Sequence, residues 1–226
     1  MKDQQKNRGW SGYVVPGPNC TTIGLVSTLK PLLDTYGVNV VSMVSMQSLS
    51  GAGEKGLRAD SEYRQNALKN LIPLIEGEEG KVVNETNKIL GKIVDGKLVN
   101  SSINIHATCT RVDVEIVHTE AVHLGLSQPA SIDDVRKTLN GYRSEAQELK
   151  LPSAADQPII AVEEADGPQP KKHGDYPPMV TLVGRLRENS IFKNGVSYVL
   201  TSDNLEKGAG GGAVLSAEYL KVKGLI

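Results

Sequence analysis

Cys20 is the residue whose type and position first suggest chemistry, because it lies in the tetrapeptide Asn19-Cys20-Thr21-Thr22 behind a Gly/Pro-rich segment, 16–18. Apolar residues recur at roughly helical spacing from Ile23 to Leu32, so a helix is predicted to begin at Cys20. The first turn of a helix carries unpaired N–H groups and the positive end of the helix dipole. It can therefore stabilise a thiolate, and it can hold the oxyanion that forms when sulfur adds to a carbonyl. Cys20 is a candidate nucleophile, and a small buried thiol is the alternative.

The elements after this helix bring further polar residues towards the cysteine. Gly37 is expected to end the helix, and the β-branched stretch Val38 to Met46 is expected to form a strand. This strand leads to Gln47 and to a Gly-rich loop at 48–53. A helix, a strand, a polar residue and a Gly-rich loop in this order are typical of an active site.

These two motifs together resemble a known family. Asn19-Cys20-Thr21-Thr22, followed 27 positions after the cysteine by Gln47 and then by Ser50-Gly51-Ala52-Gly53, is similar to the catalytic domain of aspartate-β-semialdehyde dehydrogenases of the archaeal and fungal type. The resemblance extends in order to the C-terminus. It implies that Cys20 is the acylated nucleophile and that Gln47 helps to position the thioester.

A charged turn carries two more residues of the resemblance. The segments Glu78-Glu79-Gly80-Lys81 and 85–90 match the family's Glu-Glu-x-Lys and Glu-Thr-x-Lys-Ile-Leu. By this resemblance Glu78 accepts the ammonium group of the substrate and Lys81 contacts the phosphate. From the residues alone, a solvated helix start is the alternative interpretation of such a charge cluster.

Arg111 and His118 follow a predicted half-buried strand, in which apolar and polar residues alternate from Ile103 to Thr110. Positions seven apart in a straight strand face opposite sides, so the two side chains meet only if the backbone bends between them. The family has such a bend, written Arg-Val-Pro-Val-x-Asp-Gly-His-Thr-Glu, but this chain has Asp113 for the proline and Val117 for the glycine. The resemblance implies that Arg111 grips the substrate carboxylate and that His118 moves a proton.

Two Gly-rich stretches are candidates for nucleotide binding. Gly51 to Gly56 satisfies G-x-G-x-x-G and precedes a helix expected at 62–75, yet a turn at 76–80 stands where a βαβ unit needs its second strand. The dinucleotide-binding interpretation of this stretch is therefore the weaker one.

The stretch from Asn204 to Leu220 resembles the Gly-rich C-terminal helix of the family. This implies cofactor contacts at Asn204, Gly208 and Gly210, with close helix packing as the alternative role of the glycines.

The resemblance predicts the domain organisation. Residues 1–17 would be a lead-in and a remnant of the nucleotide-binding domain, with a short strand at Trp10 to Val15 but no complete βαβ unit before Cys20. Residues 18–203 would form the catalytic and dimerisation domain. Residues 204–226 would form a helix that packs on the missing nucleotide-binding domain.

The expected fold is α+β, with a mixed, largely antiparallel sheet that carries helices on one face. One amphipathic helix is predicted from the Ser-x-x-Asp pattern at Ser131 to Leu149, and another at 81–90. In the family such a sheet makes the dimer interface, so a homodimer or homotetramer is expected.

Composition limits the partners. The 226 residues contain no apolar run long enough for a membrane span and no signal-peptide core, so a cytoplasmic protein without a membrane partner is expected. With 25 basic and 26 acidic residues, a net charge of −1 disfavours a nucleic-acid partner. Cys20 and Cys109 make no disulfide framework, and the histidines show no metal-ligand spacing with them.

The activity that the resemblance implies is NADP-dependent, reversible reductive dephosphorylation of L-4-aspartyl phosphate to L-aspartate 4-semialdehyde through a cysteine thioester. This reaction belongs to lysine, threonine and methionine biosynthesis, and the absent domain would bind most of the NADP. Alternatives are a malonyl-CoA reductase-like enzyme of the same superfamily, an inactive dimerisation fragment, and an NADP-binding protein that uses Gly51 to Gly56. The presence of both Glu78 and Arg111 favours the amino acid semialdehyde. The isolated chain is expected to show no NADPH-dependent turnover.

Overall fold

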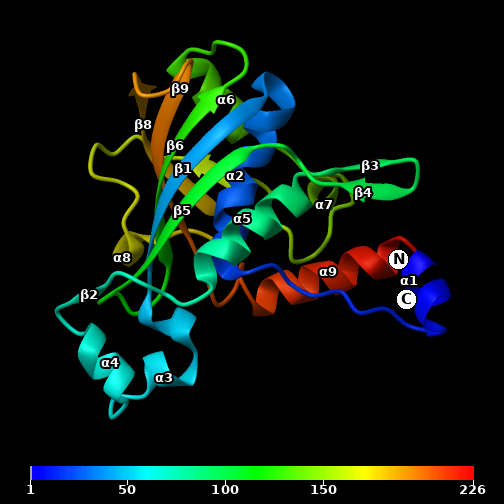
Figure 1. Cartoon of the computed structure of the whole chain (residues 1–226), viewed down its shortest axis with the longest axis horizontal. Helices are drawn as coiled ribbons and strands as arrows, with labels where there is room; N and C mark the ends of the chain where they lie inside the picture. The colour runs from blue at the N-terminus through cyan, green and yellow to red at the C-terminus, as the bar shows by residue number, and fades with distance from the viewer. Residues whose placement is uncertain (1) are drawn as a thin grey trace.

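A seven-stranded mixed sheet is the centre of the computed structural model, which describes residues 2–226 (Figure 1). The strand order is β2-β5-β1-β6-β9-β8-β7. The pairs β1/β5 and β7/β8 are parallel, and the other four neighbouring pairs are antiparallel. The strands of this sheet are β1 (Val38–Gln47), β2 (Leu71–Ile72), β5 (Asn104–Val112), β6 (His118–Leu126), β7 (Ile159–Ala161), β8 (Thr181–Asn189) and β9 (Gly195–Ser202).

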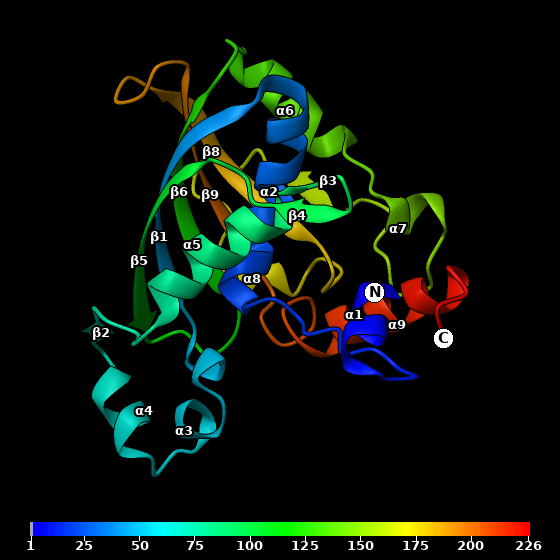
Figure 2. The ribbon, with the colours of Figure 1, turned by 45° about the vertical axis from the view of Figure 1, so that its right-hand side comes forward.

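Three helices cover one face of this sheet (Figure 2). They are α2 (Cys20–Tyr36), α5 (Glu78–Ile89) and α6 (Ile132–Gly141). The expected α+β fold, with a largely antiparallel sheet and helices on one face, is confirmed. A separate hairpin projects from the body and is formed by β3 (Lys92–Val94) and β4 (Lys97–Val99).

The remaining helices lie around the edges of this core. Figures 1 and 2 show α3 and α4 together as a small lobe beyond the end of the sheet, and they show α1 beside α9. The bounds of these helices are α1 (Lys2–Arg8), the 3-10 turn η1 (Leu49–Ala52), α3 (Glu54–Leu57), α4 (Glu62–Ala67), α7 (Glu145–Glu148), α8 (Pro170–His173) and α9 (Gly210–Val222). Within residues 2–226, no helix has the length and apolar character that a membrane crossing requires.

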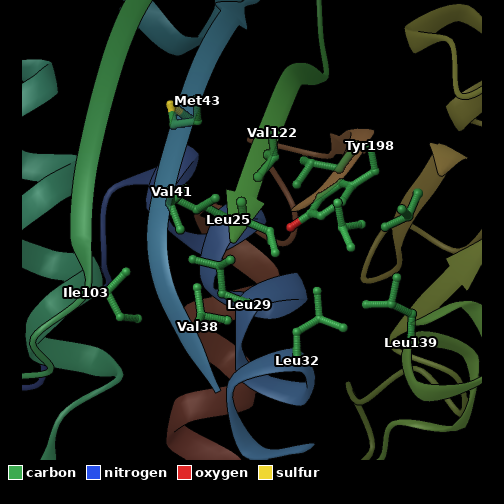
Figure 3. Packing of buried hydrophobic residues seen from close by; sticks show 14 of the residues in the cluster. Leu25, Leu29, Leu32, Val38, Val41, Met43, Ile103, Val122, Leu139 and Tyr198 are labelled. Carbon is green, nitrogen blue, oxygen red and sulfur yellow. The ribbon is translucent and has the colours of Figure 1, made fainter. Parts of the chain in front are cut away.

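The leucine stripe of α2 fixes this helix on the sheet. Leu25, Leu29 and Leu32 are wholly buried, and they pack into the same core as Val122 and Tyr198 (Figure 3). Each buried leucine contributes about 1.5–3 kcal/mol relative to an exposed one. The stripe thereby fixes the position of the N-terminal end of α2, where Cys20 lies.

Two predicted elements were wrong. The helix expected at 62–75 ends at Ala67, because the backbone becomes extended at Leu68. Leu71–Ile72 then pairs with β5 as the edge strand β2. The apolar spacing there does not describe a buried stripe, since Leu71 is 49% exposed.

The strand expected at Trp10 to Val15 is absent from the described chain, and the backbone there is held by the side chain of Gln4, which bonds the N–H and the carbonyl of Val14.

The single helix expected from Ser131 to Leu149 is two helices. Ser131 caps α6 as predicted, with its hydroxyl accepting the N–H of Asp134. The backbone becomes extended at Tyr142, and Ser144 begins α7 with a capping box of its own. A second strong cap inside an apolar stripe therefore divides the helix.

Candidate active site

The predicted position of Cys20 is confirmed, since α2 begins at this residue. Asn19 is the N-cap, and its Oδ1 accepts the N–H groups of Thr21 and Thr22 at 3.0 and 3.2 Å. Its Nδ2 donates to Oε1 of Glu78 at 2.7 Å. The cap therefore orients the first turn and also links the cysteine to the charged turn of α5.

Three predicted residues meet at one end of the sheet because of strand register. Gln47 ends β1 and pairs with Arg111 of β5, while the neighbouring Met46 pairs with Thr119 of β6 on the other side. His118 begins β6, and its Nε2 lies 3.2 Å from Sγ of Cys20. The structure thus brings together the nucleophile and the histidine that the sequence predicted.

The bend that this arrangement requires lies between β5 and β6. Leu49 and Ser50 donate their N–H groups to the carbonyls of Val114 and Glu115 at 2.7 and 3.0 Å, which closes the loop against η1. Val117 occupies the position of the family's glycine and has φ of +76°. The bend is therefore kept, although a β-branched residue rarely adopts this left-handed conformation.

Glu78 is the buried carboxylate of the site, with 7% of its surface exposed. Its Oε1 also accepts Nε2 of Gln47 at 3.2 Å, and Nζ of Lys81 lies 3.9 Å from its Oε2. The Lys81 side chain is 59% exposed, so its ammonium can reach an incoming anion. The structure thus gathers Glu78, Gln47 and Lys81 on the side of Cys20 that faces α5.

Arg111 is the buried cation, with 2% of its surface exposed. Its Nη1 donates to the carbonyl of Ser48 at 2.6 Å, and its Nε donates to the hydroxyl of Tyr63 at 3.2 Å. Among the side chains of residues 4–226, no carboxylate lies within ion-pair distance of this guanidinium. A buried charge of this kind is satisfied when an anionic ligand binds. Sequence reasoning missed Tyr63, which lies in α4 outside every motif.

The electrostatics of Cys20 differ from what its helix position suggested. Burial and the carboxylate of Glu78 raise the pKa of Cys20 to about 11, and the opposing backbone hydrogen bonds at the start of α2 are weaker. Desolvation disfavours the thiolate more than the helix terminus favours it. The helix start favours the thiolate, as expected, but burial and the Glu78 carboxylate outweigh it. Burial also raises the pKa of Cys109 to about 11.

His118 is wholly buried, and this burial together with the Arg111 guanidinium lowers the pKa of His118 to about 3. Its ring is therefore neutral near neutral pH. Ser48 holds the other side of the ring, because its backbone N–H lies 3.1 Å from Nδ1.

The C-terminal segment contributes to the same site. Asn204 is 4% exposed, and its Oδ1 accepts the N–H of Val117 at 2.9 Å and the hydroxyl of Ser48 at 3.0 Å. A Cβ on Gly208 would lie 2.8 Å from Cβ of Cys20, so only glycine allows this backbone to approach the cysteine. Gly210 has no such close neighbour, because a Cβ there would lie 3.7 Å from the carbonyl oxygen of Leu205. The cofactor contacts expected at these residues stay predictions.

The dinucleotide interpretation of Gly51 to Gly56 was wrong. A Cβ on Gly51 would lie 2.7 Å from Nη1 of Arg111, and one on Gly56 would lie 1.9 Å from the carbonyl of Leu49. These glycines allow the loop to pack closely, whereas α3, which follows, is only four residues long. A phosphate-binding βαβ unit needs a full helix and a second parallel strand. Over residues 4–226, whose side chains the structure describes, His, Cys, Asp and Glu form no group of three that could hold a metal ion.

A thiol next to a neutral histidine, with a free guanidinium and a buried carboxylate close by, defines a site for acyl transfer through sulfur. Residues 29–207 match the family described as "Semialdehyde dehydrogenase, dimerisation domain". The chain therefore belongs to the semialdehyde dehydrogenase family.

Three relatives show the extent of this similarity. The aspartate-semialdehyde dehydrogenase of Methanothermobacter thermautotrophicus is 41% identical over 96% of this chain and 61% of its own length. The malonyl CoA reductase (NADP) of Metallosphaera sedula is 32% identical over 100% of this chain and 63% of its own. The crystal structure of Candida albicans aspartate semialdehyde dehydrogenase with NADP superposes with a TM-score of 0.82 at 35% identity, covering 92% of this chain and 57% of that one. The chain thus spans about three fifths of the length of these relatives.

Proposed function

We propose that this chain provides the catalytic part of an aspartate-semialdehyde dehydrogenase, which converts L-4-aspartyl phosphate to L-aspartate 4-semialdehyde. The observation that carries the proposal is the 3.2 Å contact between Sγ of Cys20 and Nε2 of His118 at a site flanked by Arg111 and Glu78. Sulfur, imidazole, cation and carboxylate are the groups that acyl transfer from an amino acid phosphate requires.

In the acyl-transfer step, the thiol proton of Cys20 passes to Nε2 of His118, and the sulfur forms a bond to the β-carbonyl carbon as the carbon–oxygen bond to phosphate breaks. The products are an aspartyl thioester and inorganic phosphate. Gln47 lies beside the thioester, and the exposed ammonium of Lys81 receives the leaving phosphate. Arg111 binds the α-carboxylate in the bidentate manner of a guanidinium, and Glu78 binds the α-ammonium.

The buried Glu78 separates two candidate substrates. A malonyl thioester carries no ammonium, so it would leave Glu78 with only the 3.9 Å contact to Lys81 and the amide donors of Asn19 and Gln47. The aspartyl group has the cation that Glu78 needs, and the more identical relatives are aspartate-semialdehyde dehydrogenases. Both facts support the amino acid substrate over the reductase-like alternative.

NADP would bind at the edge of this site that the C-terminal segment forms. The backbone of Gly208 packs against Cys20 there, so closely that a Cβ on Gly208 would lie 2.8 Å from Cβ of Cys20. Asn204, Gly208 and Gly210 would hold the nicotinamide end, and NADP would supply the hydride that reduces the thioester. The pyrophosphate would need a helix N-terminus at a Gly-rich turn of a nucleotide-binding domain.

The oligomer that we propose is a homodimer or a homotetramer formed through the sheet of this domain, acting in the cytoplasm in lysine, threonine and methionine biosynthesis. The match to a dimerisation domain supports association of two copies. Light scattering at micromolar concentration is expected to give at least the dimer mass, and a monomer mass would contradict it.

The half reaction tests the proposal without NADP. The chain is incubated with L-4-aspartyl phosphate, and the expected result is release of phosphate with an aspartyl adduct on Cys20, detected by mass spectrometry of peptides. Cys20→Ser should lose the adduct and Cys109→Ser should keep it. No adduct on the wild-type chain would favour an inactive dimerisation fragment, and faster labelling by malonyl-CoA would favour the reductase-like alternative.

Full turnover needs hydride delivery as well. We expect no NADPH-dependent reduction of aspartyl phosphate by this chain alone, and partial recovery when the nucleotide-binding domain of a relative is added. Rapid turnover by the chain alone would contradict this division of roles.

A further inference from the structure

The buried guanidinium of Arg111 is held from the small lobe that α3 and α4 form beyond the end of the sheet (Figure 2). Its Nε donates to the hydroxyl of Tyr63, a residue of α4, at 3.2 Å. Its Nη1 donates one hydrogen to the carbonyl of Ser48 at 2.6 Å. A guanidinium has five N–H groups, one on Nε and two on each terminal nitrogen. The donors that remain for a ligand therefore lie on Nη1 and Nη2.

This arrangement limits how a carboxylate can approach Arg111. A carboxylate forms two parallel hydrogen bonds with a guanidinium along one of two edges, which are Nε with Nη2 and Nη1 with Nη2. The hydroxyl of Tyr63 occupies Nε and so closes the first edge. A bidentate ligand is left with the edge between Nη1 and Nη2.

Two contacts fix α4, and with it Tyr63, to the bend between β5 and β6. Both terminal nitrogens of Arg64 donate to the carboxylate of Glu115, at 3.1 and 2.9 Å. The N–H of Lys69 donates to Oδ2 of Asp113 at 2.9 Å. Asp113 stands where the family pattern has proline, so a residue that departs from this pattern helps to hold the lobe.

The ring of Tyr63 is held as well as its hydroxyl. Tyr63 is half-buried, and Nζ of Lys55 lies 4.5 Å from the centroid of its ring. A cation over an aromatic ring is attracted by the negative face of that ring. The phenol thus has contacts with α3 on its face and with Arg111 at its oxygen, and these contacts give it one orientation towards the guanidinium.

We propose that Tyr63 is a positioning residue, which helps to determine specificity for a substrate that carries an α-carboxylate. By holding Nε of Arg111, its hydroxyl presents the edge between Nη1 and Nη2 to that carboxylate. The identity of the ligand rests on the proposed function. The contact between Tyr63 and Arg111 concerns the chain without any ligand.

Two acyl phosphates separate this role from a general effect on the site. L-4-aspartyl phosphate carries the α-carboxylate, whereas 3-aminopropanoyl phosphate keeps the ammonium and the acyl phosphate but lacks this carboxylate. Each compound is incubated with the full chain at increasing concentration, and phosphate release gives the second-order rate constant for acylation of Cys20. The ratio of the two rate constants measures how strongly the site selects for the α-carboxylate.

Tyr63→Phe keeps the ring over Nε but removes the oxygen that accepts its hydrogen. Loss of a hydrogen bond to a charged group corresponds to roughly a tenfold change in an equilibrium or rate constant. We therefore expect a roughly tenfold lower rate constant for aspartyl phosphate and an unchanged one for 3-aminopropanoyl phosphate. Tyr36→Phe is the matched control, because it loses a hydroxyl that contacts Thr138 at the C-terminal end of α2, and it should change neither constant.

Equal losses with both compounds would show that Tyr63 only supports the lobe, and no loss with either would show that its hydroxyl has no role. Either result would overturn the proposal. Equal rate constants for the two compounds in the wild-type chain would also overturn it, because Arg111 would then not recognise the carboxylate.

The contact itself is measured without substrate. The full chain is labelled with ¹⁵N-arginine, and Arg111→Lys identifies the Nε–H signal of Arg111. We expect this ¹H signal to move upfield in Tyr63→Phe, which keeps the ring but loses the hydrogen bond, and an unmoved signal would refute the contact. A wild-type chain that forms no adduct with either acyl phosphate would contradict the proposed function and the substrate part of this inference, while the Nε–H signal still decides whether Tyr63 holds Arg111.

Discussion

Val117 holds the bend before His118 in a conformation that its side chain disfavours. Its φ is +76°, and its side chain is buried with 6% of its surface exposed. A left-handed conformation costs an L-residue roughly 1–2 kcal/mol. Val117→Gly would remove this strain but would also lose a buried side chain worth about 1.5–3 kcal/mol. The two changes oppose each other, so that variant alone does not isolate the strain.

A comparison of Val117→Gly with Val117→Ala does isolate it, because both lose the branched carbons and only alanine keeps Cβ. At an ordinary backbone position glycine is less stable than alanine by roughly 0.5–1 kcal/mol. Here the relief of roughly 1–2 kcal/mol of strain outweighs that entropy, so glycine should be more stable by roughly 0.5–1 kcal/mol. For a chain of this length, that difference corresponds to roughly 1–4 °C in Tm.

The assay is urea unfolding of both variants followed by circular dichroism, with the adjacent Ile116 as the matched position. Ile116 is 41% exposed and does not have positive φ, so Ile116→Ala should be more stable than Ile116→Gly. At Val117 the order of stability should be the opposite, with Val117→Gly more stable than Val117→Ala. If Val117→Ala equals or exceeds Val117→Gly in free energy of unfolding, the bend is not strained and the reasoning fails.

The remaining predictions concern titratable groups. Iodoacetamide near neutral pH should modify Cys20 much faster than Cys109, because burial raises the pKa of both thiols to about 11 but Cys109 alone is wholly buried; equal rates in peptide mass spectra would contradict this. Glu78→Gln removes a carboxylate that raises the pKa of Cys20, so the pH midpoint of Cys20 alkylation should fall by roughly one unit, and an unchanged midpoint would count against the coupling. Burial raises the pKa of Glu120 well above its ordinary value. The folded state therefore holds the Glu120 proton more tightly than the unfolded state, whose pKa is roughly 4.3. The resulting stabilisation is complete below the unfolded pKa and is lost as pH rises through the folded pKa. Glu120→Gln should therefore raise Tm at pH 8 with little change at pH 4, measured by scanning fluorimetry, and a lower Tm at pH 8 would refute this sign.

Local patterns predicted the elements that carry the catalytic pair. The apolar spacing from Ile23 to Leu32 predicted α2, although Ile23 and Val26 are only half-buried and the buried stripe also includes Leu25. The alternation before Arg111 predicted β5 because its apolar residues lie on the buried face of the strand. The helix expected at 62–75 failed because its apolar residues form no continuous buried stripe, since Leu71 is 49% exposed, and pairing with β5 decided the conformation of Leu71. The periodicity of apolar residues thus predicted an element correctly where the apolar face of that element is buried.

The site itself was only partly visible in the sequence. Side-chain motifs identified Cys20, Gln47 and His118, which the structure brings to one end of the sheet. Ser48 contacts Nδ1 of His118 through its backbone N–H, and no side-chain pattern in the sequence records such a contact. The pKa of Cys20 was misjudged, because it depends on burial and on the carboxylate that folding brings near, and not only on the position of the residue in a helix.

Asn204 shows how a residue far away in sequence completes this arrangement. The sequence suggested a cofactor contact there, yet its Oδ1 accepts the N–H of Val117 from 87 positions away and the hydroxyl of Ser48. A typical buried hydrogen bond contributes about 0.5–1.5 kcal/mol. Two such bonds are comparable with the roughly 1–2 kcal/mol of strain at the bend. The C-terminal segment therefore stabilises the strained backbone on one side of His118 and the Ser48 hydroxyl on the other, so Asn204 supports the geometry of the histidine even before any cofactor binds.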